Sequence, residues 1–379
     1  MARQDGTLAA LWALGIAAGF TLQRSRFCFA SAFRDLYLFG SARTLKGVIV
    51  GLGVATTGFA AIMHAAVPLP GLGLLPPEAH VLPVGISTAI GGVLFGYGMV
   101  LSGGCVSGSL YRSAEGYVAS WVTLAGVLVG LGAISQTWNW WWETLIRAEP
   151  KLWLPSTLGL GYAGAIALTF AALVATYLFA LWWEARADMF GAVAATAVVP
   201  AVTFRARLAA LWHAIFVKGW PAVIGGAALG GISIVMYTVH MPWGVTGELL
   251  RWSNAAMAAV GAPPPEALGL ADIGGCAGRA DETGLFSHTF SVTVGLVPGA
   301  LIGALLSTEF KLRFPRRAIR YAQSAAGGVV MGLGAGLGLG CTIGSFFSSV
   351  ASLSLSGWLF GAALAVGAYA GTQTIRRIP

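Results

Sequence analysis

Long apolar runs recur along the whole chain, and they decide which structures it can form. Each run is about 17 residues or longer, the length at which an α-helix can cross the hydrocarbon core of a bilayer. Hydrophobic residues make up 57% of the chain and charged residues only 9%, whereas a soluble domain carries roughly 25% charged residues to cover its surface. Because a segment in lipid must satisfy its own backbone hydrogen bonds, the sequence predicts an all-α integral membrane protein.

Nine of these runs are long enough to be transmembrane helices. They lie near residues 7–23, 45–66, 85–103, 117–137, 157–183, 220–240, 287–307, 323–341 and 355–372. The first resembles the apolar part of a signal peptide, but Gln23-Arg-Ser-Arg26 follows it where a cleavage site would need small residues. We therefore predict about nine transmembrane helices.

The placement of lysine and arginine predicts the orientation in the membrane. Loop 309–320 holds five basic residues and the C-terminus holds two arginines, so both should be cytoplasmic. Loop 67–84 has neither lysine nor arginine, and segment 261–286 carries four carboxylates against one arginine, so both should lie outside. Nine spans then place the N-terminus outside, while Arg3 favours the opposite side. The net charge of +8 follows from the cytoplasmic loops and gives no reason to expect a nucleic-acid partner.

Two stretches of the chain, 236 residues apart, carry the same pattern. Gly104-Cys105-Val-Ser-Gly108-Ser109 corresponds to Gly340-Cys341-Thr-Ile-Gly344-Ser345. In the predicted topology the two spans are five crossings apart and therefore antiparallel, as in an inverted internal repeat. We divide the chain into a first repeat half at 1–137, a connecting region with an interfacial segment and one span at 138–218, and a second repeat half at 219–379.

Two further segments interrupt the helical pattern. Residues 24–32, after the first span, begin with two arginines, and residues 240–247, after the sixth span, contain Pro242 and two glycines. Such backbone is tolerated at membrane depth only where protein buries it or where it lines a watery cavity. We interpret both segments as broken or re-entrant helices, and short surface loops are the alternative.

Other aromatic and polar residues are expected at the membrane surfaces. The tryptophan-rich segment 138–154 is typical of an aromatic belt on an outer amphipathic helix. The histidines lie near span ends, where interfacial positions are expected, and His240 beside a broken segment is the exception. The carboxylates, 14 in all, lie in loops or at span ends, which disfavours a relay of carboxylates within the membrane.

Cys105 and Cys341 are the cysteines best placed for function. Each follows a glycine-rich span and precedes a Gly-Ser pair. A new helix can begin there, and its free N–H groups and dipole would favour an anion. Close packing of helices through small residues is the alternative role of these glycines, and both roles can hold.

The other two cysteines differ in their surroundings. Cys28 lies beside Arg24 and Arg26, a cationic neighbourhood that tunes a thiol. Cys276 lies in a Gly-rich outer segment and has no counterpart in the first half. The sequence contains no CxxC pair and no histidine at ligand spacing from a cysteine, so we predict neither a metal site nor a cofactor.

The doubled cysteine motif, with Arg24-Ser-Arg26-Phe-Cys28 and Pro242-Trp-Gly-Val-Thr246, resembles the YeeE/YedE sulfur-transport family of bacterial thiosulfate-uptake membrane proteins. The resemblance implies an hourglass-like helical protein of the inner membrane with a narrow hydrophobic waist. It implies that Cys28, Cys105 and Cys341 handle thiosulfate in this pathway. It also implies a small cytoplasmic sulfur-carrier protein as a partner. Related members have been linked to selenium metabolism, so a closely related sulfur or selenium oxyanion is a further substrate candidate.

These observations predict a transporter rather than an enzyme. Thiosulfate is a dianion with a soft terminal sulfur, to which neutral thiols can donate weak hydrogen bonds while backbone N–H groups bind the oxygens. Arg26 would attract the anion, and Cys276 would have a weaker role at the outer mouth. The predicted pathway consists of the three family cysteines with Gly104, Gly108, Ser109, Gly340, Gly344 and Ser345.

Three other functions are alternatives to transport. A membrane thiol oxidoreductase, exchanging electrons between cysteines and quinone, would need paired cysteines that the sequence lacks. A scaffold built on glycine packing would not explain cysteines at matching helix breaks. A soft-metal transporter would need methionine or histidine beside the cysteines, and only Met99 and Met331 come near.

Overall fold

The structure is a computed structural model that describes residues 2–157, 159–187, 212–270, 273 and 287–377. These residues are mostly helical and contain only three isolated β-bridges in place of strands. The helices of the first half are α1 (Ala2–Ser25), α2 (Phe29–Phe39), α3 (Arg43–Ala66), η1 (Pro70–Leu72), α4 (Ile86–Ser102), α5 (Val106–Ala114) and α6 (Val118–Thr144). The helices that follow are η2 (Ile146–Ala148), α7 (Leu154–Thr157), α8 (Gly161–Ala187), η3 (His213–Val217), α10 (Ala222–Val239), α11 (Thr246–Ala259), α12 (His288–Leu306), α13 (Ile319–Leu337), η6 (Thr342–Ser348), α14 (Ser349–Ala351) and α15 (Leu355–Arg377).

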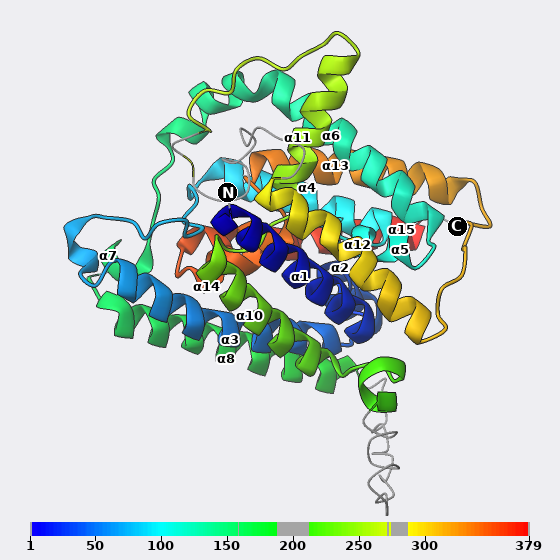
Figure 1. Ribbon diagram of the computed structural model, residues 1–379, viewed down its shortest axis with the longest axis horizontal. Coiled ribbons are helices and arrows are strands. Elements are labelled where there is room, and N and C mark those ends of the chain that lie inside the picture. The colour runs from blue at the N-terminus through cyan, green and yellow to red at the C-terminus, as the bar shows by residue number, and fades with distance from the viewer. Residues whose placement is uncertain (1, 158, 188–211, 271–272, 274–286, 378–379) are drawn as a thin grey trace, which may run out of the picture.

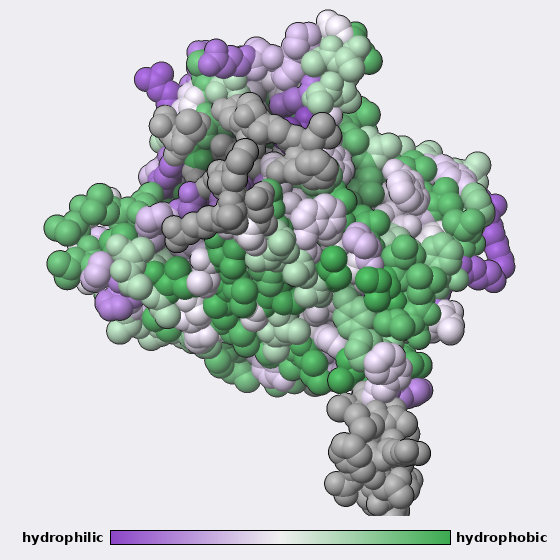
Figure 2. Space-filling model, in the orientation of Figure 1, coloured by the Kyte–Doolittle hydropathy of each residue, from purple (hydrophilic) through white to green (hydrophobic). Residues whose placement is uncertain are grey.

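Eight of the described helical segments are long and apolar enough to cross a membrane. A ninth is the pair formed by α13 with η6 and α14, which is bent by 45°. Each predicted apolar run coincides with one of these nine segments, so the prediction of about nine spans is confirmed. The long helices lie side by side (Figure 1). Apolar residues cover much of the face seen in Figure 2, and hydrophilic residues gather at its margins.

The two predicted interruptions are real breaks in the helices. The chain leaves the helical path after α1 and resumes it at α2, and it does so again between α10 and α11. Arg26, in the first break, has a φ of 48°, a left-handed conformation that few side chains other than glycine adopt. The interpretation of both segments as broken helices is confirmed.

The prediction of an interfacial helix over residues 138–154 was wrong in the extent of that helix. Helix α6 continues to Thr144, so the tryptophans of this region up to Trp142 belong to its last turns. Trp153 is fully buried rather than interfacial, and its indole donates to the carbonyl of Ser352 at 3.2 Å. Contacts with the distant C-terminal half hold this segment, and such contacts leave no local pattern in the sequence.

Helix ends and loops gather at two opposite ends of the bundle. At the basic end, Arg376 donates to the carbonyl of Tyr37 at 2.8 Å, and Tyr117 forms a bridge with Arg313. At the opposite end, loop 67–85 meets the segment just before α7 through the bridge between Pro83 and Lys151. Figure 1 shows the C-terminus on the basic side and α7 on the other side.

Glycines bring the repeated helices α4 and α13 into antiparallel contact. A Cβ added to Gly98 would lie 2.5 Å from the carbonyl oxygen of Gly327, and one added to Gly91 would lie 2.9 Å from that of Gly334. Adding 236 to Gly91 gives Gly327, and adding 236 to Gly98 gives Gly334, so each contact is the repeat image of the other. This reciprocal, antiparallel contact agrees with an inverted repeat.

Four short helical segments, α2, α5, α11 and the pair η6–α14, are oriented with their C-terminal ends toward the two ends of the bundle. At the basic end, the carbonyl of Leu36 in α2 accepts from Trp183, and the carbonyl of Glu115, just after α5, accepts from Lys311. At the opposite end, the carbonyl of Ala262, just after α11, accepts from Gln136, and Ser352, just after α14, contacts Trp153. The N-terminal ends of all four therefore lie inside the bundle.

Candidate functional site

Each of the three cysteines that the structure describes stands at the N-terminus of a short helix. Cys28 precedes α2, Cys105 precedes α5 and Cys341 precedes η6, and each has an extended backbone at that position. All three are free and at most 1% exposed. The predicted position of Cys105 and Cys341 at a helix break is thus observed, and Cys28 occupies the same kind of position.

Cys28 and Cys105 come together although 77 residues separate them. Their Sγ atoms lie 3.8 Å apart, within the range of a weak thiol hydrogen bond. Gly108 makes this approach feasible, because a Cβ at that position would lie 2.7 Å from the Cys28 sulfur. The Gly108 amide also donates to the Cys105 sulfur at 3.3 Å. The glycine predicted for the pathway therefore contacts both thiols.

The second motif has its own set of contacts. A Cβ added to Gly340 would lie 2.5 Å from the Ser345 hydroxyl, and that hydroxyl donates to the carbonyl of Gly338 at 2.7 Å. His80 is fully buried, and its Nδ1 lies 3.1 Å from the carbonyl oxygen of Gly344. The interfacial position expected for His80 was wrong, because loop 67–85 folds inward onto the helix that Cys341 begins.

Aromatic rings connect the two cysteine sites. Phe29, next to Cys28, makes edge contacts with Phe346 and Phe347 at centroid distances of 6.4 and 6.0 Å. Phe33 contacts Phe346 at 6.3 Å. These rings are buried, so an apolar layer lies between the N-terminus of α2 and the helix that Cys341 begins.

A polar cavity opens at the basic end. It has a volume of about 300 Å³ and is lined by Arg26, Tyr111, Arg112, Glu115, Tyr117, Glu309 and Arg313. Arg112 belongs to α5 and donates to the carbonyl of Gly103 at 2.5 Å, just before the cysteine motif. We call this space the basic-end cavity. It brings the predicted Arg26 near the first motif, and Gly104 lies beside Arg112.

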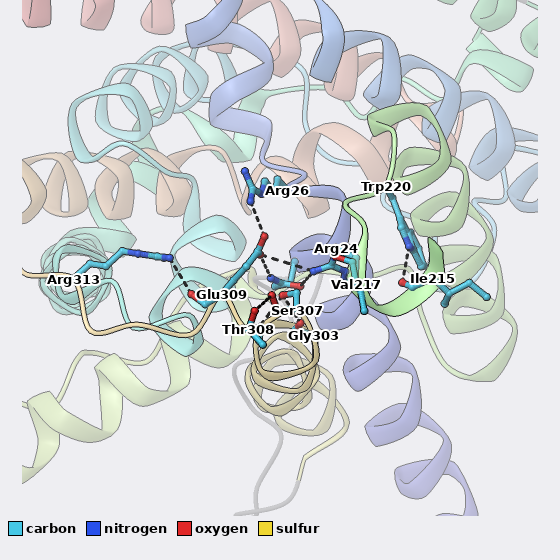
Figure 3. Close-up of polar contacts among 12 residues, drawn as sticks. Arg24, Arg26, Ile215, Val217, Trp220, Gly303, Ser307, Thr308, Glu309 and Arg313 are labelled. Carbon is cyan, nitrogen blue, oxygen red and sulfur yellow. Dashed lines mark hydrogen bonds and ion pairs between the residues drawn. The ribbon is translucent and has the colours of Figure 1, made fainter. Parts of the chain in front are cut away.

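Glu309 is the centre of the polar contacts at the margin of this cavity (Figure 3). Its carboxylate accepts from Arg26 at 2.7 Å and from Gln23 at 2.9 Å, and it lies 3.8 Å from Arg24. Arg24 is 1% exposed and also donates to the carbonyl of Val217 at 2.7 Å. These contacts fasten the loop after α12 to the end of α1.

The pKa values of the two carboxylates near the cavity are shifted in opposite directions. Burial alone would raise the pKa of Glu309, but the hydrogen bond and charge of Arg26 hold that pKa below its usual value. Burial raises the pKa of Glu115, against the hydrogen bond from Gln23 and the charge of Arg112. Glu309 is therefore the more firmly ionised of the two and neutralises part of the arginine charge.

Two polar residues near the site, Arg112 and Glu248, were not predicted from the sequence. Arg112 follows Cys105 by seven residues, a spacing that places both on one face of a helix. This spacing in the sequence could therefore have identified Arg112 as a residue near the site. Glu248 gave no such signal, yet it is fully buried in α11 and is bound by Arg251 at 2.6 Å and by Ser287 at 3.1 Å. Its bonds to α12 residues depend on the tertiary fold.

The predictions for Cys276 and for metal binding remain to be compared with the structure. Cys276 lies outside the described residues. Within the described ranges, no group of three or more His, Cys, Asp and Glu side chains is arranged to hold a metal ion.

The fold and the site define a polytopic helical membrane protein whose broken helices bring buried cysteines together. The chain belongs to the sulphur transport family, which matches residues 24–370. This is a family of transport proteins rather than enzymes.

Three relatives indicate the range of similarity. Probable transporter YedE of Escherichia coli is 31% identical over 172 residues, which are 45% of this chain and 40% of that protein. Thiosulfate transporter TsuA of Escherichia coli is 29% identical over 223 residues, which are 59% of this chain and 58% of that protein. Thiosulfate transporter TsuA of Spirochaeta thermophila is 34% identical over 180 residues, which are 45% of this chain and 52% of that protein. The matched part thus spans about half the length of these relatives.

Proposed function

We propose that this protein carries thiosulfate, or a closely related sulfur or selenium oxyanion, into the cell across the bacterial inner membrane. The observation that carries the proposal is the position of Cys28, Cys105 and Cys341, each buried at the inward N-terminus of a short helix. The names of the two thiosulfate transporters among the relatives support the choice of substrate.

The chemistry of the site suits a dianion with one soft sulfur. A row of thiolates would repel the anion, whereas neutral thiols donate weak hydrogen bonds to its terminal sulfur. The helix N-termini at the same positions offer N–H groups to the oxygens. Gly104 and Gly340 precede the two cysteines, and the first turns of the helices that follow contain Gly108, Ser109, Gly344 and Ser345. Since each contact is weak, an ion can leave one site for the next, as conduction requires.

The basic-end cavity is the cytoplasmic mouth in this proposal. The positive-inside rule assigns loop 309–320 and the C-terminus to the cytoplasm and loop 67–84 to the outside. Arg26, Arg112 and Arg313 line the cavity and would draw the anion out of the apolar layer. A small cytoplasmic sulfur-carrier protein would take up the substrate at this mouth.

One contact favours a second function. The 3.8 Å approach of the Cys28 and Cys105 sulfurs brings together the kind of thiol pair that a membrane thiol oxidoreductase would use with quinone. Quinone-dependent oxidation of these thiols in the purified protein, without thiosulfate uptake, would favour this alternative.

Uptake of labelled thiosulfate by proteoliposomes of the purified protein tests the transport proposal. Time-dependent accumulation above that of empty liposomes is expected, with competition by unlabelled thiosulfate. Wild-type protein that is correctly folded and inserted but accumulates no thiosulfate would refute the proposal.

A further inference from the structure

A second cavity lies beside the Cys341 motif, toward the end of the bundle opposite the basic end. Its volume is about 40 Å³, and it lies between α6, α11 and α13. Ser135 and Thr246 line its walls, and Gly336 and Gly340 line it next to Cys341. A single water needs roughly 10–15 Å³ on this measure, so the cavity has room for about three to four water-sized atoms, comparable to the oxygens of one tetrahedral oxyanion.

A proline-rich strap covers the cavity. Pro264, Pro265, Ala267 and Leu270 are among its lining residues. The strap is tied to the end of α6, where the Trp138 indole donates to the carbonyl of Leu268 at 2.9 Å. Asn139 bonds the strap twice, at 3.0 Å each time. The cavity therefore has a defined roof, and the strap belongs to the segment predicted to lie outside.

Two buried polar atoms at the cavity have no hydrogen-bond partner among the described residues. One is the hydroxyl of Thr246, a residue that is 3% exposed, and the other is the Oδ1 atom of Asn254. A buried polar group without a partner costs roughly 1–3 kcal/mol, so such groups indicate a missing ligand or water. Because Asn254 can present either its oxygen or its amide nitrogen after a flip, both side chains can donate.

The N-terminus of α11 strengthens this indication. Thr246 is the first residue of this 14-residue helix, and the Val245 side chain before it cannot cap the free N–H groups. Glu248, in the first turn, is directed away to Arg251, Ser287 and Thr289. The N–H groups at the start of α11 therefore have no side-chain cap and remain available to the oxygens of an anion.

We propose that this cavity binds the oxygens of a tetrahedral oxyanion, which for thiosulfate is the sulfonate end. The inference rests on the proposed transport function and adds a binding site for the hard end of the substrate. The α2 helix of the first half begins at the thiol Cys28, whereas α11 begins at Val245 and Thr246. The first half therefore provides a site with two thiols, those of Cys28 and Cys105. The second half provides a site with the Thr246 hydroxyl and the Asn254 amide, with Cys341 nearby.

Selenate can test this binding site independently of thiosulfate transport. It is a tetrahedral oxyanion without a soft terminal sulfur, and its selenium can be located by anomalous scattering. Crystals of the wild-type protein grown with selenate should show an anomalous peak between Thr246, Asn254 and Gly340. Absence of this peak at saturating selenate, or a peak only in the basic-end cavity, would overturn the proposal.

Matched threonine variants give the energetic test. Thr246→Val keeps the shape and removes the hydroxyl, so selenate affinity measured by calorimetry in nanodiscs should fall at least tenfold. Thr246→Ser should restore most of it. Thr238→Val is the control, because the Thr238 hydroxyl is exposed and, among the described residues, bonds only to the carbonyl of Ile234 in its own helix. Equal affinities of the two valine variants would overturn the proposal.

Thiosulfate uptake by the same variants distinguishes the two proposals. If the site is an outer binding step, Thr246→Val should raise the KM for thiosulfate added outside about tenfold and change kcat less. Selenate binding at Thr246 in a wild-type protein that takes up no thiosulfate would refute the transport proposal and retain the site. Thiosulfate uptake without selenate binding would support the transport proposal and overturn the proposed oxyanion site.

Discussion

At the scale of single residues, Gly108 is the position where the first motif tolerates least change. A Cβ there would lie 2.7 Å from the Cys28 sulfur and 3.2 Å from the Cys105 sulfur, so Gly108→Ala must separate the two thiols. We expect thiosulfate uptake to fall more than tenfold, although alanine suits a helix better than glycine by about 1 kcal/mol. Uptake by proteoliposomes at matched protein density measures this.

Gly231→Ala is the control for that substitution. Gly231 also lies within a helix, and a Cβ there would have no neighbour within 4 Å. This variant should transport at the wild-type rate. If Gly108→Ala transports equally well, the close approach of Cys28 and Cys105 has no role in transport.

The thiols themselves give a second prediction at this scale. Cys105→Ala and Cys341→Ala should each abolish uptake or reduce it greatly, because each removes the thiol at a helix N-terminus. Serine at either position should restore uptake only in part, since its hydroxyl still donates but is smaller and harder. Cys276→Ala should be tolerated better than the other cysteine substitutions. Near-normal uptake by both the Cys105 and Cys341 alanine variants at normal expression would exclude a thiol pathway.

At the scale of helices and loops, Glu309 joins the α12–α13 loop to α1 and predicts a pH dependence. The pKa of Glu309 is lowered in the folded protein, so its carboxylate stabilises the fold above the unfolded pKa of about 4.3. That contribution is lost as pH falls through the lower, folded pKa. The melting temperature of wild-type protein should therefore exceed that of Glu309→Gln at pH 7, and the difference should shrink below about pH 4.

Glu266→Gln is a control for this measurement, because among the described residues that glutamate is bonded only through its backbone carbonyl. Its melting temperature should follow the wild-type curve. A difference between wild type and Glu309→Gln that stays constant from pH 7 to pH 3 would mean that the carboxylate charge does not hold the loop.

The helices themselves were largely predictable from the sequence, whereas their contacts were not. Apolar runs and polar or Gly/Pro-rich interruptions are local signals, so the spans and the breaks before α2 and α11 could be found. The inward turn of His80 and the burial of Glu248 depend on residues far away in the chain, His80 on Gly344 and Glu248 on Ser287. The repeat offset of 236 indicated which cysteines correspond, but it gave no reason to pair Cys28 with Cys105.

At the scale of the whole molecule, the glycine contacts relate the two halves as an inverted repeat would. The helix pair α4 and α15 packs through Gly96 against Leu364, and the corresponding pair α13 and α6 packs through Gly332 against Val127. Gly332 lies 236 residues after Gly96, so equivalent glycines of the two halves make the close contact in both helix pairs. An odd number of crossings between α4 and α13 makes these helices antiparallel, and the loops at the two ends of the bundle must then face opposite sides of the membrane.

Sidedness therefore gives the last prediction. Leu74, in loop 67–84, is 60% exposed, and Leu312, in loop 309–320, is 62% exposed. In a Cys276→Ala background that retains uptake, the remaining native cysteines are buried. A membrane-impermeant maleimide should label Leu74→Cys in intact cells and Leu312→Cys only after permeabilisation, because the positive-inside rule predicts that loop 309–320, with its five basic residues, is cytoplasmic. Labelling of both positions from the same side would contradict the inverted arrangement, and labelling of the two in reversed order would place the basic-end cavity outside the cell.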